Sequence, residues 1–242
     1  MDNKTILIIG ASSELGLEFI RANHEKYDKI ISHYFSNDAN LLSIKNDIGE
    51  KIVPVQGDLS NISSIQEFID NIAKISDDIQ YILHLPAPKY KLVKFAKIPI
   101  NDYVDSYNVQ VLSIAMILKK FITKMSKKKY GKVVFILSSC TNNNPPKYAN
   151  DYVTNKYALL GMMKSLASEY ADKKLNINAI SPSMMETKFL DNVPELIIHQ
   201  NKENSPMKRN AEIKDIIPAI EYFLSDSSEY VTGQNIVIAG GN

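Results

Sequence analysis

The sequence predicts a single α/β domain built on a doubly wound parallel sheet. Seven apolar runs of strand length recur along the chain, and most are continuous rather than alternating, as in strands covered on both faces. Segments with helical spacing lie between these runs. Because strands alternate with helices, the connections should be right-handed crossovers that place helices on both sides of the sheet.

Length and composition fit one soluble domain spanning residues 1–242. The apolar fraction of 45% is ordinary, and a chain of this size can bury one large core. A formal net charge of +1 gives no electrostatic reason to expect nucleic acid or an acidic membrane as a partner. Cys140 is the only cysteine, which fits a reducing compartment. With neither a signal-peptide pattern nor a span-length apolar stretch, we expect a cytoplasmic protein without a membrane partner.

The first half of the chain predicts four strands and two helices. The apolar strand Thr5–Ile9 ends in a glycine turn, and helical spacing follows over Leu15–Glu25. A second apolar stripe extends over Ile62–Ile75, with Ser60 or Asn61 as its expected N-cap. The four strands are predicted at Thr5–Ile9, Lys29–Phe35, Lys51–Val55 and Ile79–Leu85.

The second half predicts three strands, three helices and one long segment without a clear period. Helical spacing appears over Asp102–Met125, Tyr152–Tyr170 and Glu212–Leu224. A weakly patterned stretch as long as Ser183–Asn210 is usually functional, and in this architecture it lies over the carboxyl ends of the strands, where ligands bind. We therefore expect residues 183–210 to form a substrate lid. The three strands are predicted at Lys132–Leu137, Leu175–Ile180 and Asn235–Ile238.

The turn after the first strand is suited to a pyrophosphate. Gly10 permits a tight bend, and Gly16 lies where the next helix must pack closely on the sheet. The helix N-terminus offers unpaired N–H groups, and Ser12 and Ser13 can add hydroxyl donors. Glu14 is unfavourable near phosphates, although the helix dipole favours a carboxylate in the first turn, so we expect its side chain to point away.

The end of the second strand indicates which nicotinamide cofactor is used. An acid there would bind the adenosine ribose and reject a 2′-phosphate, but none occurs before Asp38. This favours NADPH over NADH. No arginine is present to bind the 2′-phosphate, so NAD is not excluded. His33 is either a helper of that phosphate or a structural histidine.

A catalytic set is indicated by Tyr152, Lys156 and Ser139. The spacing Tyr-x-x-x-Lys also occurs at Tyr90 and Tyr170, but only Tyr152 has a serine thirteen positions upstream, directly after a strand. On a helix, Tyr152 and Lys156 share a face, and the ammonium should lower the pKa of the phenol from about 10.

Such a phenol can donate a proton to a carbonyl oxygen while hydride reaches the carbon, or accept one in the reverse direction. Ser139 would hold the substrate oxygen, and the alternation of a strand should point Ser138 to the opposite side. The plainer interpretation is a half-buried tyrosine beside a solvated lysine on an amphipathic helix.

These motifs resemble those of the short-chain dehydrogenase/reductase family over nearly the whole chain. The resemblance implies a Rossmann fold with seven parallel strands in the order 3-2-1-4-5-6-7. It adds Asn108, in Tyr107-Asn108-Val109, as the fourth member of a catalytic tetrad with Ser139, Tyr152 and Lys156. By the same resemblance, the cofactor would contact Gly10, Ser12, Ser13, Leu15, Gly16, Asp58, Leu59, Ala87, Tyr152, Lys156, Pro182 and Thr187.

The sequence departs from the family pattern at three places. Glu14 replaces the middle glycine of the first turn, and Ser183 replaces the glycine after Pro182. The segment Leu85-Pro86-Ala87-Pro88 stands where the family has N-N-A-G, so only the alanine is kept. Two prolines remove backbone donors from that turn and stiffen it.

The leading functional hypothesis is a ketone reductase that uses NADPH, with no metal. The chain looks most similar to 3-oxoacyl-carrier-protein reductases, so its substrate is a small carbonyl compound or one bound to a carrier protein. Four lysines either dock that acidic carrier or are solvated surface groups: Lys128, Lys129, Lys173 and Lys174. The resemblance also implies a dimer or tetramer joined through the long helices that begin near Asp102 and Asp151.

Two alternatives remain open. A sugar or polyol dehydrogenase of a specialised biosynthetic pathway would use Asn144, Tyr148 and His199 for contacts to hydroxyl groups. A non-catalytic scaffold would keep the fold and bind a nucleotide or partner without turnover. The altered glycine turn favours the scaffold, and the complete tetrad argues against it.

Overall fold

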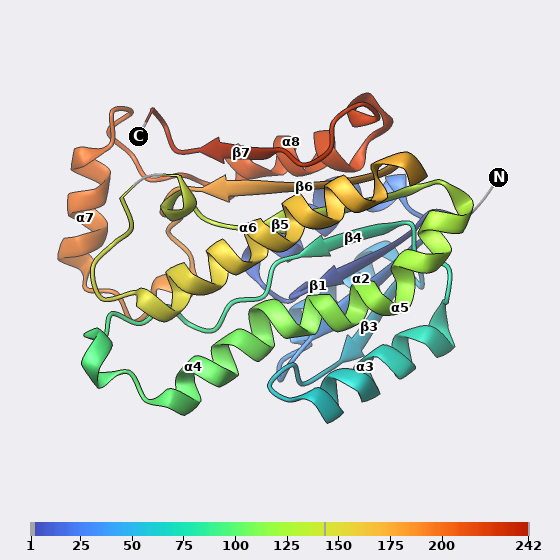
Figure 1. The fold of residues 1–242 in the computed structure, drawn as a ribbon, viewed down its shortest axis with the longest axis horizontal. Helices are drawn as coiled ribbons and strands as arrows, with labels where there is room; N and C mark the ends of the chain where they lie inside the picture. Colours follow the sequence, from blue (N-terminus) through green and yellow to red (C-terminus); the bar gives the residue numbers. More distant parts are fainter. Residues whose placement is uncertain (1–2, 143, 242) are drawn as a thin grey trace.

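The computed structural model describes residues 3–142 and 144–241. Seven parallel strands form one sheet in the order β3-β2-β1-β4-β5-β6-β7, as predicted (Figure 1). The strands are β1 (Thr5–Ile9), β2 (Lys29–Tyr34), β3 (Ile52–Gln56), β4 (Tyr81–His84), β5 (Gly131–Ile136), β6 (Leu175–Pro182) and β7 (Asn235–Ile238).

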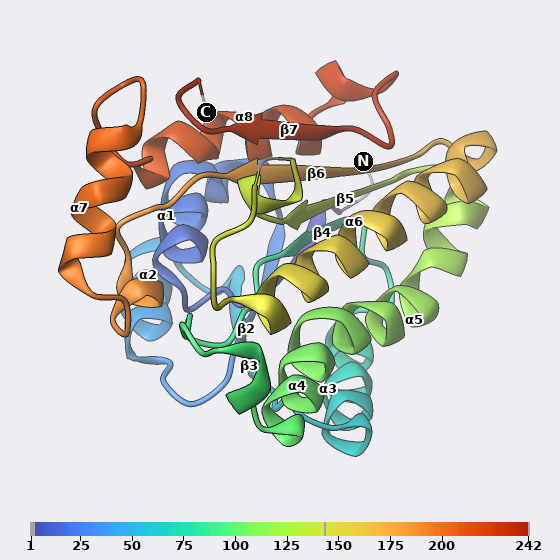
Figure 2. The ribbon, with the colours of Figure 1, turned by 60° about the vertical axis from the view of Figure 1, so that its left-hand side comes forward.

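Helices cover both faces of the sheet, as Figure 2 shows from a second side. Buried side chains of α3, α5 and α6 pack on one face, and those of α1, α2 and α8 pack on the other. The helices are α1 (Glu14–Asn23), α2 (Ala39–Ile48), α3 (Ile62–Ile75), α4 (Ile100–Tyr107), α5 (Ser113–Lys128), α6 (Asn150–Tyr170), α7 (Glu195–Asn204) and α8 (Ile213–Leu224).

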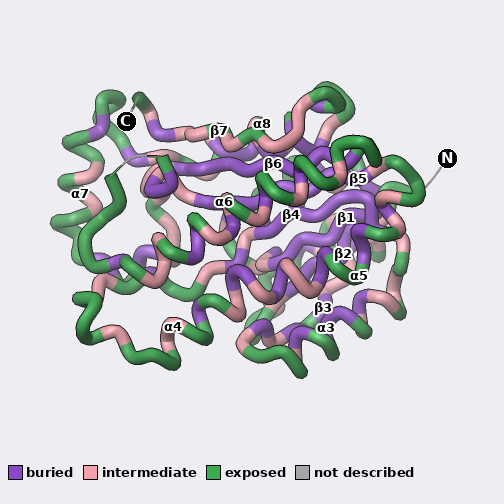
Figure 3. The backbone as a smooth tube through the Cα atoms, in the orientation of Figure 1, coloured by how far each residue is buried: buried purple, intermediate pink, exposed green. Residues whose placement is uncertain are grey.

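The continuous apolar strands are explained by this two-sided burial. In β1, Ile6 and Ile8 belong to the core under α1 and α8, whereas Leu7 and Ile9 belong to the core under α3 and α5. All four side chains have no exposed surface, because both faces of a doubly wound sheet are covered. In Figure 3 the sheet is the buried centre of the molecule, and the surface of α7 is mostly exposed.

The predicted helix over 102–125 is interrupted. Between α4 and α5 the chain makes one π-helical turn, Asn108–Leu112, in which the Ser113 N–H donates to the Asn108 carbonyl. A π turn leaves some carbonyls without their usual backbone donors, and such turns are frequent at functional sites. Here the Ser113 hydroxyl donates to the Val109 carbonyl at 2.7 Å, and His84 Nε2 donates to the Gln110 carbonyl at 2.8 Å.

The segment 183–210 is more ordered than its weak pattern suggests. Met185 pairs with Ala211 in an isolated parallel bridge, Lys188–Leu190 forms a 3-10 turn, and α7 follows. The sequence missed α7 because its ten residues present no buried side chain and therefore no apolar stripe. It also missed α2, in which only Leu41 and Ile44 are buried.

Within residues 3–142 and 144–241, no helix has both the length and the apolar character that crossing a membrane requires.

At the start of α3, Asn61 is the N-cap, with its side-chain oxygen accepting from the Ser64 N–H at 3.0 Å. This decides between the two N-cap candidates, Ser60 and Asn61.

Candidate active site

A cleft of about 1160 Å³ lies at the carboxyl ends of the central strands. That volume accommodates a dinucleotide and a small substrate together. Loops after β1, β2, β3, β4, β5 and β6 all contribute to its walls, and so does the segment 183–210. Of the predicted site residues, the cleft is lined by Gly10, Ser12, Ser13, Leu15, Asp58, Leu59, Ala87, Ser139, Tyr152, Lys156, Pro182 and Thr187.

The first turn of the cleft has the geometry expected of a phosphate loop. Gly10 has φ of 79°, a left-handed conformation that glycine adopts without strain. A Cβ added to Gly16 would lie 2.6 Å from the Ala11 carbonyl oxygen, so the close approach of α1 requires glycine there. Ser13 caps α1, with its hydroxyl oxygen accepting from the Gly16 N–H at 3.2 Å.

Glu14 does not point away from the cleft. Its side chain lines the cleft, and its carboxylate accepts a hydrogen bond from the Lys188 backbone N–H at 2.9 Å. This bond joins the first turn of α1 to the 3-10 turn of the segment 183–210. The prediction was wrong because no local pattern indicates that a backbone donor 174 positions away lies opposite the helix N-terminus.

His33 is a structural residue. Its Nδ1 accepts from the Gly10 N–H at 3.0 Å, and its Nε2 bonds the Gly57 carbonyl oxygen at 3.0 Å. Because a carbonyl only accepts, Nε2 carries the proton and the ring is neutral; burial lowers its pKa to about 4. His33 therefore holds the glycine turn against the end of β3 and has no free nitrogen for a phosphate.

The adenosine end of the cleft has neither of the usual determinants of cofactor choice. Phe35, 61% exposed, lines the cleft just after β2. Asp38 lies outside the lining, so no carboxylate at this position opposes a 2′-phosphate. Among the described lining residues, the lysines are Lys89, Lys156 and Lys188.

Tyr152 and Lys156 lie one turn apart on α6, as predicted. Lys156 Nζ lies 5.4 Å from the centroid of the Tyr152 ring and donates to the Ile136 carbonyl at 3.0 Å. The ammonium thus stands over the ring and turns toward the end of β5. Burial lowers the pKa of Lys156 to about 8.

The predicted fall in the pKa of Tyr152 does not occur in this structure. Burial raises the pKa, and the neighbouring Cys140 and Tyr90 add to the rise. The group that lowers it is the Ser138 side chain, through a hydrogen bond. The sequence could not anticipate this balance, because the elements that bury the ring are distant in the chain.

Both Ser138 and Ser139 line the cleft near the tyrosine, and the role of Ser139 stays a prediction. Strand β5 ends at Ile136, and a 3-10 turn over Ser139–Thr141 begins directly after Ser138. Strand alternation therefore no longer decides where these side chains point. The Ser138 side chain lowers the pKa of Tyr152, against the larger rise from burial, and its hydroxyl oxygen accepts from the Cys140 N–H at 3.3 Å.

An aromatic wall around Tyr152 was missed. The Tyr90 ring meets the Tyr152 ring edge-on, with 5.1 Å between centroids, and the Phe189 centroid lies 5.8 Å from that of Tyr152. The Tyr90 and Phe189 rings also contact each other, with 5.7 Å between their centroids. The sequence offered Tyr90 only as a chance Tyr-x-x-x-Lys match, and Phe189 lay in a segment without periodicity. Together with Met184 and Leu190, these rings make this end of the cleft apolar.

Asn108 occupies the π turn rather than the cleft. Its Nδ2 donates to the Ser60 carbonyl at 2.7 Å, which ties the turn to the loop after β3. Asp58 shapes that loop, its carboxylate accepting from the Ser60 N–H at 2.8 Å. Of the polyol-contact candidates, Asn144 lines the cleft, whereas Tyr148 and His199 lie outside the lining.

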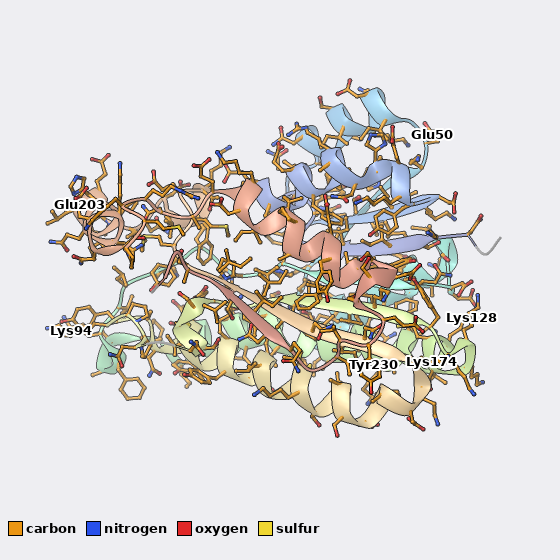
Figure 4. The ribbon with its side chains drawn as sticks, turned by 90° about the horizontal axis from the view of Figure 1, so that it is seen from above. Glu50, Lys94, Lys128, Lys174, Glu203 and Tyr230 are labelled. Atoms are coloured by element: carbon orange, nitrogen blue, oxygen red, sulfur yellow. The ribbon has the colours of Figure 1, made fainter. Side chains whose placement is uncertain are left out.

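The proposed docking lysines lie at the wrong edge of the sheet. Lys128 and Lys129 precede β5, and Lys173 and Lys174 precede β6, so all four lie at the amino ends of parallel strands. The cleft lies at the carboxyl ends. Figure 4 shows Lys128 and Lys174 at the end of the molecule opposite Lys94 and α7. Within one chain, these lysines cannot guide a carrier to the cleft.

The cleft fits a nicotinamide dinucleotide. Gly10, the capped N-terminus of α1 and the close contact at Gly16 form a cradle that a larger side chain would fill. Lys156 and Tyr152 stand at the other end of the same cleft. Glu14, at the N-terminus of α1, is a carboxylate of the cleft lining that opposes an anionic ligand there.

Comparisons with known proteins agree with this architecture. A family model described as "Enoyl-(Acyl carrier protein) reductase" matches residues 10–242. The 3-oxoacyl-[acyl-carrier-protein] reductase of Rickettsia prowazekii (strain Madrid E) is 25% identical over 241 residues, covering 100% of this chain and 97% of that protein.

Two solved structures have the same fold. A 3-oxoacyl (acyl-carrier-protein) reductase from Agrobacterium tumefaciens C58 with NADP bound superposes with a TM-score of 0.88 and 20% identity, covering 99% of this chain and 94% of that one. An NAD⁺-bound xylitol dehydrogenase gives a TM-score of 0.84 and 22% identity, covering 98% of each chain.

Proposed function

The chain belongs to the short-chain dehydrogenase/reductase family, and we propose that it reduces a ketone to a secondary alcohol with NADPH. The observation that carries the proposal is the position of Tyr152, Lys156 and Ser138 in the same cleft as the glycine turn. The relatives named as 3-oxoacyl-carrier-protein reductases support it. Cytoplasmic location and assembly into a dimer or tetramer remain predictions.

The residues would divide the chemistry as follows. Gly10 and the N-terminus of α1 bind the pyrophosphate, and Lys156 binds a ribose hydroxyl. When bound, the reduced nicotinamide supplies the hydride. The Ser138 hydroxyl holds the carbonyl oxygen beside Tyr152. As the alkoxide forms, the Tyr152 hydroxyl donates its proton to that oxygen, and the phenolate takes a proton from Lys156.

The electrostatics of the site suit reduction. Because burial raises the pKa of Tyr152, the phenol is fully protonated at neutral pH and ready to donate. The ammonium of Lys156, whose pKa is about 8, is still mostly protonated there and stabilises the phenolate when it forms. Asn108 fixes the π turn next to α6, and its membership of the catalytic tetrad stays a prediction.

We propose an apolar acyl ketone, such as a 3-oxoacyl thioester, as the substrate class. Tyr90, Phe189 and Leu190 present rings and methyl groups to the reacting end of the cleft. A sugar ketone would leave its hydroxyl groups without partners against this wall, which costs free energy. The predicted polyol contacts from Tyr148 and His199 are not available, because neither lines the cleft.

NADPH is the preferred cofactor in this proposal because no carboxylate at the end of β2 repels a 2′-phosphate. The site has no cation there either, so NADH should bind as well. Titration with each cofactor, followed by nicotinamide fluorescence, measures both affinities. Measurable binding of both cofactors, with a somewhat lower Kd for NADPH than for NADH, supports the proposal. Absence of binding for both rejects it.

Turnover separates an enzyme from a binding scaffold. Tyr152→Phe should abolish reduction of a 3-oxoacyl thioester while leaving the affinity for NADPH intact. Tyr157→Phe is the matched control, because Tyr157 lies on the same helix and is 47% exposed. If wild-type protein binds NADPH but reduces neither acyl nor sugar ketones, the scaffold interpretation is correct.

A further inference from the structure

The aromatic wall beside Tyr152 contains a buried hydroxyl group, that of Tyr90. Tyr90 is 7% exposed and lines the cleft. Among residues 3–142 and 144–241, its hydroxyl has no hydrogen-bond partner, whereas buried polar side-chain atoms nearly always have one. A buried hydroxyl without a partner costs free energy, and a phenylalanine ring would fill the same place in the wall. Packing of the wall therefore does not explain why this residue is a tyrosine.

The hydroxyl of Tyr90 is accessible from the cleft. Tyr90 is not among the described side chains whose fully enclosed polar atoms lack a partner, so its oxygen keeps some accessible surface. Because the residue lines the cleft, a molecule bound there can reach that oxygen. Burial raises the pKa of Tyr90, so the group is a neutral phenol at physiological pH and can donate a hydrogen bond.

Backbone contacts with two other segments hold Tyr90 in place. Its N–H donates to the Phe189 carbonyl at 3.3 Å, and farther along the same loop the Val93 N–H donates to the Tyr148 carbonyl at 2.7 Å. The loop after β4 is thus fastened both to the segment 183–210 and to the loop before α6. A side chain held in this way loses little freedom when it binds a ligand.

Tyr90 is also close to the hydroxyl that reacts. The rings of Tyr90 and Tyr152 meet edge-on, with 5.1 Å between their centroids. Burial is the main cause of the raised pKa of Tyr152, Cys140 adds to it, and Tyr90 adds to it as well, because a charge on one phenol disfavours a charge on the other. A substrate whose ketone oxygen lies beside Tyr152 therefore has its neighbouring atoms next to Tyr90.

We propose that the Tyr90 hydroxyl is a specificity-determining group that donates a hydrogen bond to a second carbonyl oxygen of the substrate, separated from the reacting ketone by a single CH₂ group. A 3-oxoacyl thioester has this arrangement, because its thioester carbonyl stands next but one to the ketone. A sugar ketone would pair one hydroxyl group with Tyr90 and leave the others unpaired against rings and methyl groups. The inference rests on the proposed reduction and adds what the site recognises besides the ketone.

The contact should affect KM more than kcat. The thioester carbonyl is unchanged by the reaction, so its hydrogen bond to Tyr90 is equally strong in the bound substrate and in the transition state. An interaction of this kind lowers KM without raising kcat. Loss of the proton donor Tyr152, by contrast, lowers kcat.

Tyr90→Phe tests the inference, because it keeps the ring and removes only the hydroxyl. We expect KM for a 3-oxoacyl thioester to rise by roughly tenfold, the effect of one hydrogen bond. The comparison substrate is the corresponding thioether ketone, in which CH₂ replaces the thioester carbonyl, and its KM should change far less. Tyr148→Phe is the matched control, since Tyr148 is 50% exposed and lies outside the lining.

The two KM changes decide the matter. An equal rise for both ketones would show that the variant only disturbs the wall, and no change for either would show that the hydroxyl does not reach the substrate. Both results overturn the inference. Thermal unfolding gives a second check, because Tyr90→Phe should unfold at the same midpoint as wild type if no bond within the fold is lost. A clear fall would place the partner of the hydroxyl inside the protein and overturn the inference as well.

Binding without turnover separates this inference from the proposed function. In Tyr152→Phe with NADPH present, calorimetry should show that adding Tyr90→Phe raises the Kd of a 3-oxoacyl thioester by roughly tenfold. The same rise for a wild-type protein that reduces nothing would support the contact and reject only the proposed reaction. A protein that reduces both ketones with KM values that Tyr90→Phe leaves unaltered keeps the proposed function and loses this inference.

Discussion

The Glu14 carboxylate accepts a hydrogen bond from the backbone N–H of Lys188 at 2.9 Å. Through this bond, the helix that should bind the pyrophosphate is joined to the segment 183–210, which lines the cleft. A carboxylate in the first turn of α1 also stabilises that helix through its dipole. The same residue therefore favours the folded protein and disfavours an anionic ligand.

We expect Glu14→Gln to bind NADPH more tightly than wild type. Removing one charge at a helix N-terminus is worth about 0.3–1 kcal/mol, or roughly twofold to fivefold in Kd. The thermal midpoint should fall slightly, because the dipole loses its counter-charge. Glu18→Gln is the control, since Glu18 lies on the same helix and pairs with Arg21. An unchanged Kd at low salt would show that the carboxylate does not reach the phosphates.

The two neighbouring serines should differ. We expect Ser138→Ala to lower kcat/KM by roughly a hundredfold, the effect of losing one donor to a developing oxyanion. Ser139→Ala should have a much smaller effect, and neither change should alter the Kd for NADPH. Steady-state kinetics on the two variants decide the matter: a severe defect confined to Ser139→Ala would restore the assignment made from sequence spacing.

Phe189 should set the preference for apolar substrates. In Phe189→Ala the ring that packs on Tyr152 is lost, so KM for a 3-oxoacyl thioester should rise by about tenfold, equal to about 1.4 kcal/mol. The Kd for NADPH should not change. Leu196→Ala is the control, because Leu196 lies on α7 and is 66% exposed. Equal losses for acyl and sugar ketones would argue against an apolar substrate pocket.

The stability of the protein should fall in mild acid. His33 is buried and neutral, with its pKa lowered from 6.5 to about 4. Between these values the unfolded chain binds the proton first, so the free energy of unfolding is full above about pH 6.5 and declines as pH falls toward 4. His84 acts in the same direction, because burial lowers its pKa to about 3.

Chemical denaturation at pH 7 and at pH 5 measures this effect. His33→Gln keeps a donor for the Gly57 carbonyl but removes the titration, so its stability should depend less on pH than that of wild type. His199→Gln, a change on the exposed surface of α7, should leave the dependence as it is. A wild-type protein equally stable at both pH values would contradict the expectation.

Much of the fold follows from local sequence. Runs such as Thr5–Ile9 are apolar at nearly every position because both faces of a parallel sheet are buried. This continuous pattern can be recognised in the sequence alone. The Asn61 cap and the apolar stripe of α3 are equally local. The glycine turn could be predicted because a left-handed φ at Gly10 and a missing Cβ at Gly16 are demands that only glycine meets.

What the sequence could not decide depends on contacts between distant segments. Spacing selected Ser139, but it did not indicate that Ser138, which begins the 3-10 turn after β5, lowers the pKa of Tyr152. Four lysines were candidates for docking a carrier, but they lie at the amino ends of the parallel strands, opposite the cleft.

The sequence by itself determined the fold, the turn for a dinucleotide and the tyrosine–lysine pair, because each depends on spacing along one or two neighbouring elements. Only the tertiary structure decided the protonation of the site. Tyr90, Phe189, His84 and Ile136 reach it from separate loops and strands, and the burial they impose raises the pKa of Tyr152 and lowers that of Lys156. Desolvation depends on the whole surroundings of a group, and no local pattern records it.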